Sequence, residues 1–295
     1  MYYIFYTFFY LISLLPWRVL YIISDLITFL LQRVLKYRVE VVKHNLEIAF
    51  PNKTSEERKK IANDFYQQLT DSFIETIKLL SISDKTFNMR YTSNVEVLND
   101  LYKTGQSVQI MAGHFFNWEF ANWGIAKYSR YPFIGVYMPL SNKYFDRLIL
   151  NMRKRYGSIM ISATNFRNQF RDHASKGPYA LALAADQNAG NPLSAYWVPF
   201  FGQPTPFVKG PEKGAKLNNT AEVFVHFYRI KRGYYHTNYE LMTTSPNYFK
   251  DGQLTALYVK TLEEKIKINP SNYLWSHRRW RYTFDPIKHG KLLVE

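Results

Sequence analysis

Short apolar runs alternate with amphipathic stretches along most of the chain, and each pattern predicts a different element. Short apolar runs bounded by turn residues are typical of buried strands. The predicted strands lie at residues 108–112, 133–137, 159–161, 179–184, 221–229 and 234–241. Apolar residues at helical spacing predict helices at residues 38–50, 54–80, 146–156 and 254–268. Because strands alternate with helices, we predict an α/β fold with a central mixed sheet flanked by helices.

The N-terminal segment follows a different pattern. Its first 17 residues carry no side-chain charge, and only Arg18 and Asp25 interrupt an apolar stretch that runs to Leu31. A spanning helix needs about 20 mostly apolar residues, whereas a break at Pro16 would leave two shorter helices lying in the membrane surface. A buried helix of a soluble domain is the third interpretation. We expect residues 1–32 to anchor a single domain, residues 33–295, to a membrane.

Composition narrows the chemistry. The absence of cysteine excludes disulfides, thiolate metal sites and thioester-forming nucleophiles. No cluster of histidines and acids has metal-ligand spacing, so we expect neither a metal nor another cofactor. A net charge of +15 indicates a polyanionic partner, either nucleic acid, anionic lipid or an acidic protein. The basic clusters at residues 153–155, 229–232 and 278–281 suit phosphate or carboxylate groups, which guanidinium groups bind bidentately.

One histidine stands where the 108–112 strand is predicted to end. His114 follows that strand, and Glu119 lies five residues further along the chain. A neutral imidazole can take a proton from an attacking hydroxyl while a carboxylate holds the ring. In a regular helix the two side chains would point about 140° apart, so they meet only if a turn precedes the helix. About half of one such pair is expected by chance among 7 histidines and 23 acidic residues.

Two further segments follow predicted strands. Asp186-Gln187-Asn188 comes directly after the 179–184 strand, where α/β sheets usually carry functional loops. Residues 198–205 are apolar and rich in turn formers, and two interpretations remain open for them. They form either a packed loop, which the composition favours, or one wall of a slot for an acyl chain.

These motifs occur in an order that resembles a known family. The order is Arg38, Asn45-Leu46, Ala49-Phe50-Pro51, Gly113-His114-x4-Glu119, Asp186-Gln187, Pro199-Phe200-Phe201-Gly202 and Trp275-x-His277-Arg278-Arg279-Trp280. It resembles the late acyltransferases of bacterial lipid A biosynthesis, which are lauroyl and myristoyl transferases of the lysophospholipid acyltransferase superfamily. The resemblance covers nearly the whole chain, from about residue 30 to residue 285.

The resemblance implies a glycerol-3-phosphate-acyltransferase-like fold on the cytoplasmic face of the bacterial inner membrane. The enzyme would move an acyl chain from acyl carrier protein to a hydroxyl of a lipid A precursor. It implies that His114 is the general base, that Glu119 orients it, and that Asp186 and Arg155 are polar elements of the site. We also expect substrate contacts from Asn117, Gln187, Arg278 and Arg279. The family often carries a second acid where this chain has Asn188.

Two other readings are open at this point. The same chemistry could act on an aminolipid or a glycerophospholipid, in which case only the acceptor differs. A non-enzymatic basic protein that binds nucleic acid or anionic lipid through the cluster at residues 278–281 would bind with a steep salt dependence and without need of His114. It leaves the ordered motifs unexplained, so we expect an enzyme with no nucleic-acid partner.

Overall fold

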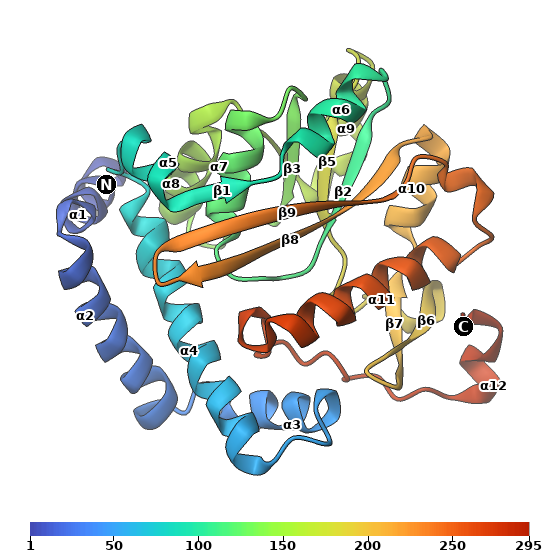
Figure 1. Cartoon of the computed structure of the whole chain (residues 1–295), viewed down its shortest axis with the longest axis horizontal. Coiled ribbons are helices and arrows are strands. Elements are labelled where there is room, and N and C mark those ends of the chain that lie inside the picture. Colours follow the sequence, from blue (N-terminus) through green and yellow to red (C-terminus); the bar gives the residue numbers. More distant parts are fainter. Residues whose placement is uncertain (295) are drawn as a thin grey trace.

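A seven-stranded mixed sheet forms the centre of the protein, whose residues 1–294 are described by a computed structural model (Figure 1). The strand order is β1-β9-β8-β2-β5-β3-β4, and every neighbouring pair is parallel except the β8–β9 hairpin. The strands are β1 (Tyr91–Ser93), β2 (Val108–Ala112), β3 (Phe133–Tyr137), β4 (Ile159–Ser162), β5 (Ala180–Ala184), β8 (Ala221–Lys231) and β9 (Tyr234–Thr243). The expected α/β fold with a mixed sheet flanked by helices is confirmed.

Helices cover both faces of this sheet. Successive residues of β8 point to opposite faces: Val225 lines a cavity under α7 and α8, and the ring of Phe224 lies 5.9 Å from that of Tyr258 in α11. The helices after the N-terminal segment are α3 (Val39–Ala49), α4 (Ser55–Lys78), α5 (Asp84–Arg90), α6 (Glu96–Lys103), α7 (Trp118–Tyr128), α8 (Lys143–Arg153), α9 (Phe166–Ala174), α10 (Gly210–Asn218), α11 (Gln253–Ile268) and α12 (Pro286–His289).

Residues 198–205 do not form the loop that their composition favoured, and none of them lines the cavity at His114. They belong to a separate antiparallel hairpin of β6 (Ala195–Phe200) and β7 (Gln203–Val208). The chain turns at Phe201 and Gly202, both with left-handed backbone at φ 52° and 74°. The ring of Phe200 is fully buried and stacks on Trp280. The prolines in this segment are typical of loops and edge strands, which explains why its sequence pattern did not predict a hairpin.

The N-terminal segment folds into two helices that pack against α4. They are α1 (Tyr2–Leu14) and α2 (Trp17–Phe29), separated at Pro16 as one interpretation of the sequence expected, and α2 continues as a π-helical turn over Leu30–Val34. Lys78 Nζ of α4 donates to the carbonyl of Ser13 at 2.7 Å. Within residues 1–294 no single helix is long and apolar enough to cross a membrane. Only α1 and α2 taken together have the necessary length and composition, and they are bent by 110°.

Candidate active site

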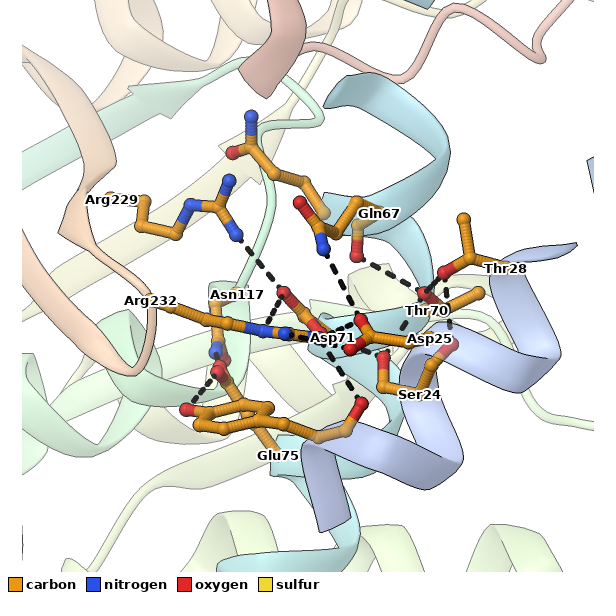
Figure 2. A network of polar contacts seen from close by, with 12 residues as sticks. Ser24, Asp25, Thr28, Gln67, Thr70, Asp71, Glu75, Asn117, Arg229 and Arg232 are labelled. Carbon is orange, nitrogen blue, oxygen red and sulfur yellow. Dashed lines mark hydrogen bonds and ion pairs between the residues drawn. The ribbon is translucent and has the colours of Figure 1, made fainter. Parts of the chain in front are cut away.

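His114 lies at the carboxyl end of the central strand β2. Asn117, three residues after His114, has left-handed backbone with φ 66°, and α7 begins directly after it. Its buried amide nitrogen donates to the Glu75 carboxylate of α4, which also accepts hydrogen bonds from the hydroxyls of Tyr235 and Tyr21 at 2.6 and 2.9 Å (Figure 2). Burial raises the pKa of Glu75 to about 7. Helix α4 therefore holds the turn between His114 and α7 in place.

The partner of the His114 ring is Asp186. Strands β2 and β5 are parallel neighbours, with Ala112 opposite Ala184. His114 and Asp186 each stand two residues beyond these positions, so the sheet brings them together. Nδ1 of His114 lies 2.6 Å from Oδ1 of Asp186, and the backbone N–H of His114 donates to Oδ2 at 2.9 Å. Asp186 is 1% exposed and the His114 side chain 28%.

The sequence analysis expected Glu119 to orient the His114 ring, but in the structure Glu119 forms no hydrogen bond with that ring. It lies in the first turn of α7 and forms a bidentate ion pair with Arg153 of α8, whose Nε and Nη2 donate at 3.0 and 2.6 Å. Trp118 Nε1 donates to the same carboxylate at 2.9 Å. The left-handed residue Asn117 directs the start of α7 so that Glu119 faces α8, whereas His114 faces the loop after β5. The two residues nevertheless line one cavity.

In the His114–Asp186 pair, the contact between the two side chains outweighs burial in setting the direction of both pKa shifts. Burial lowers the pKa of His114, but the carboxylate of Asp186 and its hydrogen bond outweigh burial and raise that pKa above 6.5. Burial raises the pKa of Asp186, but the contacts with His114 outweigh burial and hold it below 3.8. With Nδ1 bound to Asp186, Nε2 is the ring nitrogen left to exchange a proton, and it makes no hydrogen bond within residues 1–294.

An apolar cavity of about 430 Å³ extends from His114 between the sheet and the helices α7 and α8. Small residues on this face of the sheet leave the space open, namely Ala112, Ala182, Ala184 and Gly135. Gly135 pairs in register with Ala182 and Met160, two strand positions below the end of β2. Apart from His114, the polar groups lining it include Glu119, Arg153 and Asp146. The cavity thus joins an apolar interior to a polar mouth, as sites for chain-like apolar ligands require.

The other predicted site residues lie in different places. Asn117 is 1% exposed and supports the turn rather than lining the cavity. Arg155 lies outside the cavity and binds Asp84 at 3.2 Å, so the arginine that reaches the cavity is Arg153. The sequence analysis named Arg153 only within the basic cluster at residues 153–155 and chose Arg155 for the site. The two arginines stand two residues apart, and spacing does not reveal which of them turns inward.

The loop after β5 and the C-terminal segment meet beside Asp186. Arg279 is 1% exposed and donates through Nη1 to Asn188 Oδ1 at 3.0 Å, whereas Arg278 is exposed and its carbonyl accepts from Asn188 Nδ2. Gln187, the residue before Asn188, is half-buried. Asn188, which stands where the family often has an acid, thus joins this loop to the C-terminal segment.

The motifs at the two ends of the chain assemble around the His114 turn. Asn45 of α3 donates to the carbonyls of Trp275 and His277 at 2.7 and 2.8 Å. Leu274 N–H in turn donates to the His114 carbonyl at 3.1 Å. These contacts explain why residues more than 200 positions apart occur together in the ordered motifs: they form one support for the turn that carries His114.

An α/β sheet that carries a His–Asp pair at the mouth of an apolar cavity defines a candidate acyl-transfer enzyme. The model of the bacterial lipid A biosynthesis acyltransferase family matches residues 1–282, and the chain belongs to that family. It is 28% identical over 276 residues to the lipid A biosynthesis palmitoleoyltransferase of Escherichia coli (strain K12), covering 90% of this chain and 86% of that protein.

Two further relatives agree with this membership. Identity is 26% to the lipid A biosynthesis lauroyltransferase of Escherichia coli (strain K12), covering 92% of this chain and 88% of that protein. It is 27% to a lipid A biosynthesis acyltransferase of Haemophilus influenzae, covering 83% and 78% respectively. The expected family is thereby confirmed, and membership supports an acyltransferase acting in lipid A biosynthesis rather than a non-enzymatic binding protein.

Proposed function

We propose that the protein transfers a fatty acyl chain from acyl carrier protein to a hydroxyl of a lipid A precursor. The observation that carries the proposal is the His114–Asp186 pair at the mouth of the apolar cavity, because it places a proton acceptor beside a space suited to an acyl chain. The net charge of +15 supports an acidic carrier protein as donor, since complementary charge speeds association.

His114 acts as the general base in this mechanism. With the ring hydrogen on Nδ1 bound to Asp186, Nε2 takes the proton of the acceptor hydroxyl as its oxygen attacks the thioester carbonyl. The tetrahedral intermediate collapses, the carbon–sulfur bond breaks, and the protonated ring returns the proton to the leaving thiolate. The products are an ester and a free thiol, so protons and electrons balance without a covalent acyl-enzyme.

Arg153 is the donor best placed to stabilise the oxyanion. Its Nε and Nη2 are taken up by Glu119, and its Nη1 makes no hydrogen bond within residues 1–294 while the side chain lines the cavity. A fixed cation of this kind stabilises charge that develops in the transition state. In this mechanism Glu119 acts through Arg153, as a positioning residue, and does not contact the His114 ring.

Helices α1 and α2 attach the enzyme to the cytoplasmic face of the inner membrane. Large apolar side chains on both helices face outward, among them Ile4, Phe8, Leu11, Ile22, Leu26 and Phe29, each more than half exposed. An apolar face of this size is favourable in a lipid interface and costly in water. We propose that the two helices lie in the interface, because Pro16 separates them at a bend of 110°.

The proposed function is tested by the loss of activity in His114→Ala. We expect kcat to fall by about 10²–10⁴-fold, the usual contribution of a general base. Cooperative thermal unfolding well above the assay temperature is the control for folding, because removing His114 also leaves the buried Asp186 carboxylate without its partner. In cells lacking their own late acyltransferases, mass spectrometry should show lipid A one acyl chain heavier with the wild type only. A new acylated aminolipid with unchanged lipid A would show that the acceptor is an aminolipid and not a lipid A precursor. Near-normal turnover of His114→Ala would show that His114 is not the base.

The depth of the cavity should set the length of the transferred chain. In Gly135→Leu the new side chain enters the cavity, where an added Cβ meets the flexible end of Met160 at 3.1 Å and Asn122 Oδ1 at an ordinary contact distance of 3.8 Å. Each methylene that no longer fits costs about 1–3 kcal/mol, so we expect kcat/KM for long donors to fall at least tenfold. A set of acyl donors of graded length measures this, and unchanged kcat/KM for the shortest donor is the internal control. Equal loss at every length would contradict the assignment of the cavity.

A further inference from the structure

A second cavity, of about 330 Å³, lies between α4 and the tip of the β8–β9 hairpin. All of its lining residues except Ile230 are polar or charged, and three of them are the cations Arg229, Lys231 and Arg232. No acidic residue lines it. This basic cluster is the one at residues 229–232, to which the proposed chemistry assigns no role.

A buried carboxylate holds the two arginines in position. Asp71 of α4 is fully buried and accepts from Arg229 Nη1 at 3.0 Å and from Arg232 Nη2 at 2.6 Å (Figure 2). Asp25 of α2 binds the other side of Arg232. Ordering long side chains in advance lowers the entropy lost when a ligand binds. All three nitrogens of Arg232 donate to Asp71 or Asp25, whereas Nε and Nη2 of Arg229 make no hydrogen bond within residues 1–294.

Lys231 is the cation without an acidic partner. It is exposed, and among residues 1–294 its ammonium forms no ion pair, lying 4.3 Å from the centre of the Tyr234 ring. The arginines share the charges of Asp71 and Asp25, so Lys231 leaves the cavity with an uncompensated positive charge. The spare donors of Arg229, this ammonium and the amides of Gln67 and Gln68 suit an anion with several oxygens. A carboxylate would be satisfied by Arg229 alone, whereas a phosphate group engages both cations.

The polar cavity and the active-site cavity share a wall. Strand β8 continues past the end of β2, and Phe227 lines the active-site cavity while Arg229, two residues on, lines the polar one. Two strand residues span about 7 Å. Asn272 lines the polar cavity, donates to the Phe227 carbonyl at 2.7 Å, and accepts from the N–H of Phe116 in the His114 turn at 3.0 Å. The two cavities are therefore neighbours along strand β8.

The site also lies beside the proposed membrane-binding face. Arg232 contacts the carbonyl of Tyr21 in α2, and an added Cβ at Gly233 would clash with the Tyr21 hydroxyl, so the hairpin tip packs directly on α2. The outward residues Ile22 and Leu26 of that helix are apolar and exposed. A cationic cavity at this level would lie among lipid headgroups, where phosphates are concentrated.

We propose that this cavity binds a phosphate group of the lipid acceptor, with Arg229 and Lys231 as its ligands, while the acceptor hydroxyl lies at His114. The inference rests on the proposed function and adds to it a subsite for the acceptor headgroup. Asp71 is a positioning residue here, since it holds Arg229 without reaching the ligand.

Lys231→Gln tests the inference because Lys231 lies outside the buried ion-pair network. With a phosphorylated lipid acceptor we expect KM to rise about tenfold with kcat within twofold, as loss of one charge-assisted contact implies. With the same acceptor after removal of its phosphates, wild type and variant should have equal KM. Lys231→Arg should restore the wild-type KM. Lys250→Gln is the control for the change in net charge, because Lys250 is exposed and does not line the cavity.

Inorganic phosphate and vesicles distinguish the sources of the ligand. Inorganic phosphate should inhibit the wild type competitively with the phosphorylated acceptor, and less so the variant. If Lys231→Gln instead weakens binding to vesicles containing phosphatidic acid and raises KM equally for both acceptors, the cavity binds bulk lipid and the inference is wrong. Equal wild-type KM for the two acceptors overturns the inference alone. No transfer by the wild type to either acceptor overturns the proposed function as well.

Discussion

Asp186→Asn is expected to lower kcat by about 10²–10⁴-fold, close to the effect of removing His114 itself. Asp186 accepts two hydrogen bonds from His114, one from the ring and one from the backbone N–H. An asparagine has one oxygen for these two donors, and its NH₂ group must face the other. If that group faces Nδ1, the ring hydrogen moves to Nε2 and the base is lost, although the side chain keeps its size.

The same substitution should move the acid limb of the pH profile. The pKa of His114 lies above 6.5 because Asp186 outweighs burial, so kcat/KM of the wild type should fall as the pH drops through a value above 6.5. In Asp186→Asn only burial remains, and burial lowers the pKa of a histidine. The limb should therefore shift to below pH 6.5. Asp172→Asn, an exposed acid on α9, serves as the control; an unmoved limb in Asp186→Asn would contradict the assigned pair.

The His114–Asp186 pair should also make the stability of the fold depend on pH. His114 has a raised pKa, so its contribution is complete below pH 6.5 and lost as the pH rises through the folded value. Asp186 has a lowered pKa, so its contribution is complete above pH 3.8 and lost as the pH falls through the folded value. Asp186→Asn should therefore reduce the melting temperature more at pH 5.5 than at pH 8.5.

The sequence located His114 and Asp186 at the ends of two strands but did not pair them. Pairing them requires the strand order, because β2 and β5 are neighbours although β3 and β4 separate them in the chain. Order in a sheet depends on contacts between distant segments, which local patterns do not record. The five-residue spacing favoured Glu119 instead, since it was the acid nearest in the chain.

Local patterns predicted elements well where burial is uniform along a segment. The apolar runs of β2 and β3 are buried between helix layers, and these strands begin and end at the predicted residues. Strand β1 is three residues long, too short for a periodic pattern, and was missed. The cavity was also beyond prediction, because it is made by small residues from three strands, β2, β3 and β5, whose register the sequence does not reveal.

Removing Glu119 should lower both the free energy of unfolding and kcat, because Glu119 forms a buried ion pair with Arg153. Glu119 is 3% exposed, so Glu119→Ala leaves a largely buried guanidinium without a partner. Breaking a buried pair in this way costs about 3–5 kcal/mol of unfolding free energy, and we expect the lower end because the Arg153 side chain is 19% exposed. Loss of the oriented donor should also reduce kcat by about 10²–10³-fold.

The double variant Glu119→Leu with Arg153→Met distinguishes the effect of the ion pair on stability from its effect on kcat. Apolar residues of similar volume replace a buried pair at little cost, so the free energy of unfolding should return to near the wild-type value while kcat stays low. Denaturant unfolding and steady-state kinetics on the two single variants and the double variant measure both quantities. Asp100→Asn, which breaks an exposed pair with Lys103, should change stability by less than about 1 kcal/mol. Recovered activity in the double variant would show that Arg153 supports the fold of the cavity and does not stabilise the oxyanion.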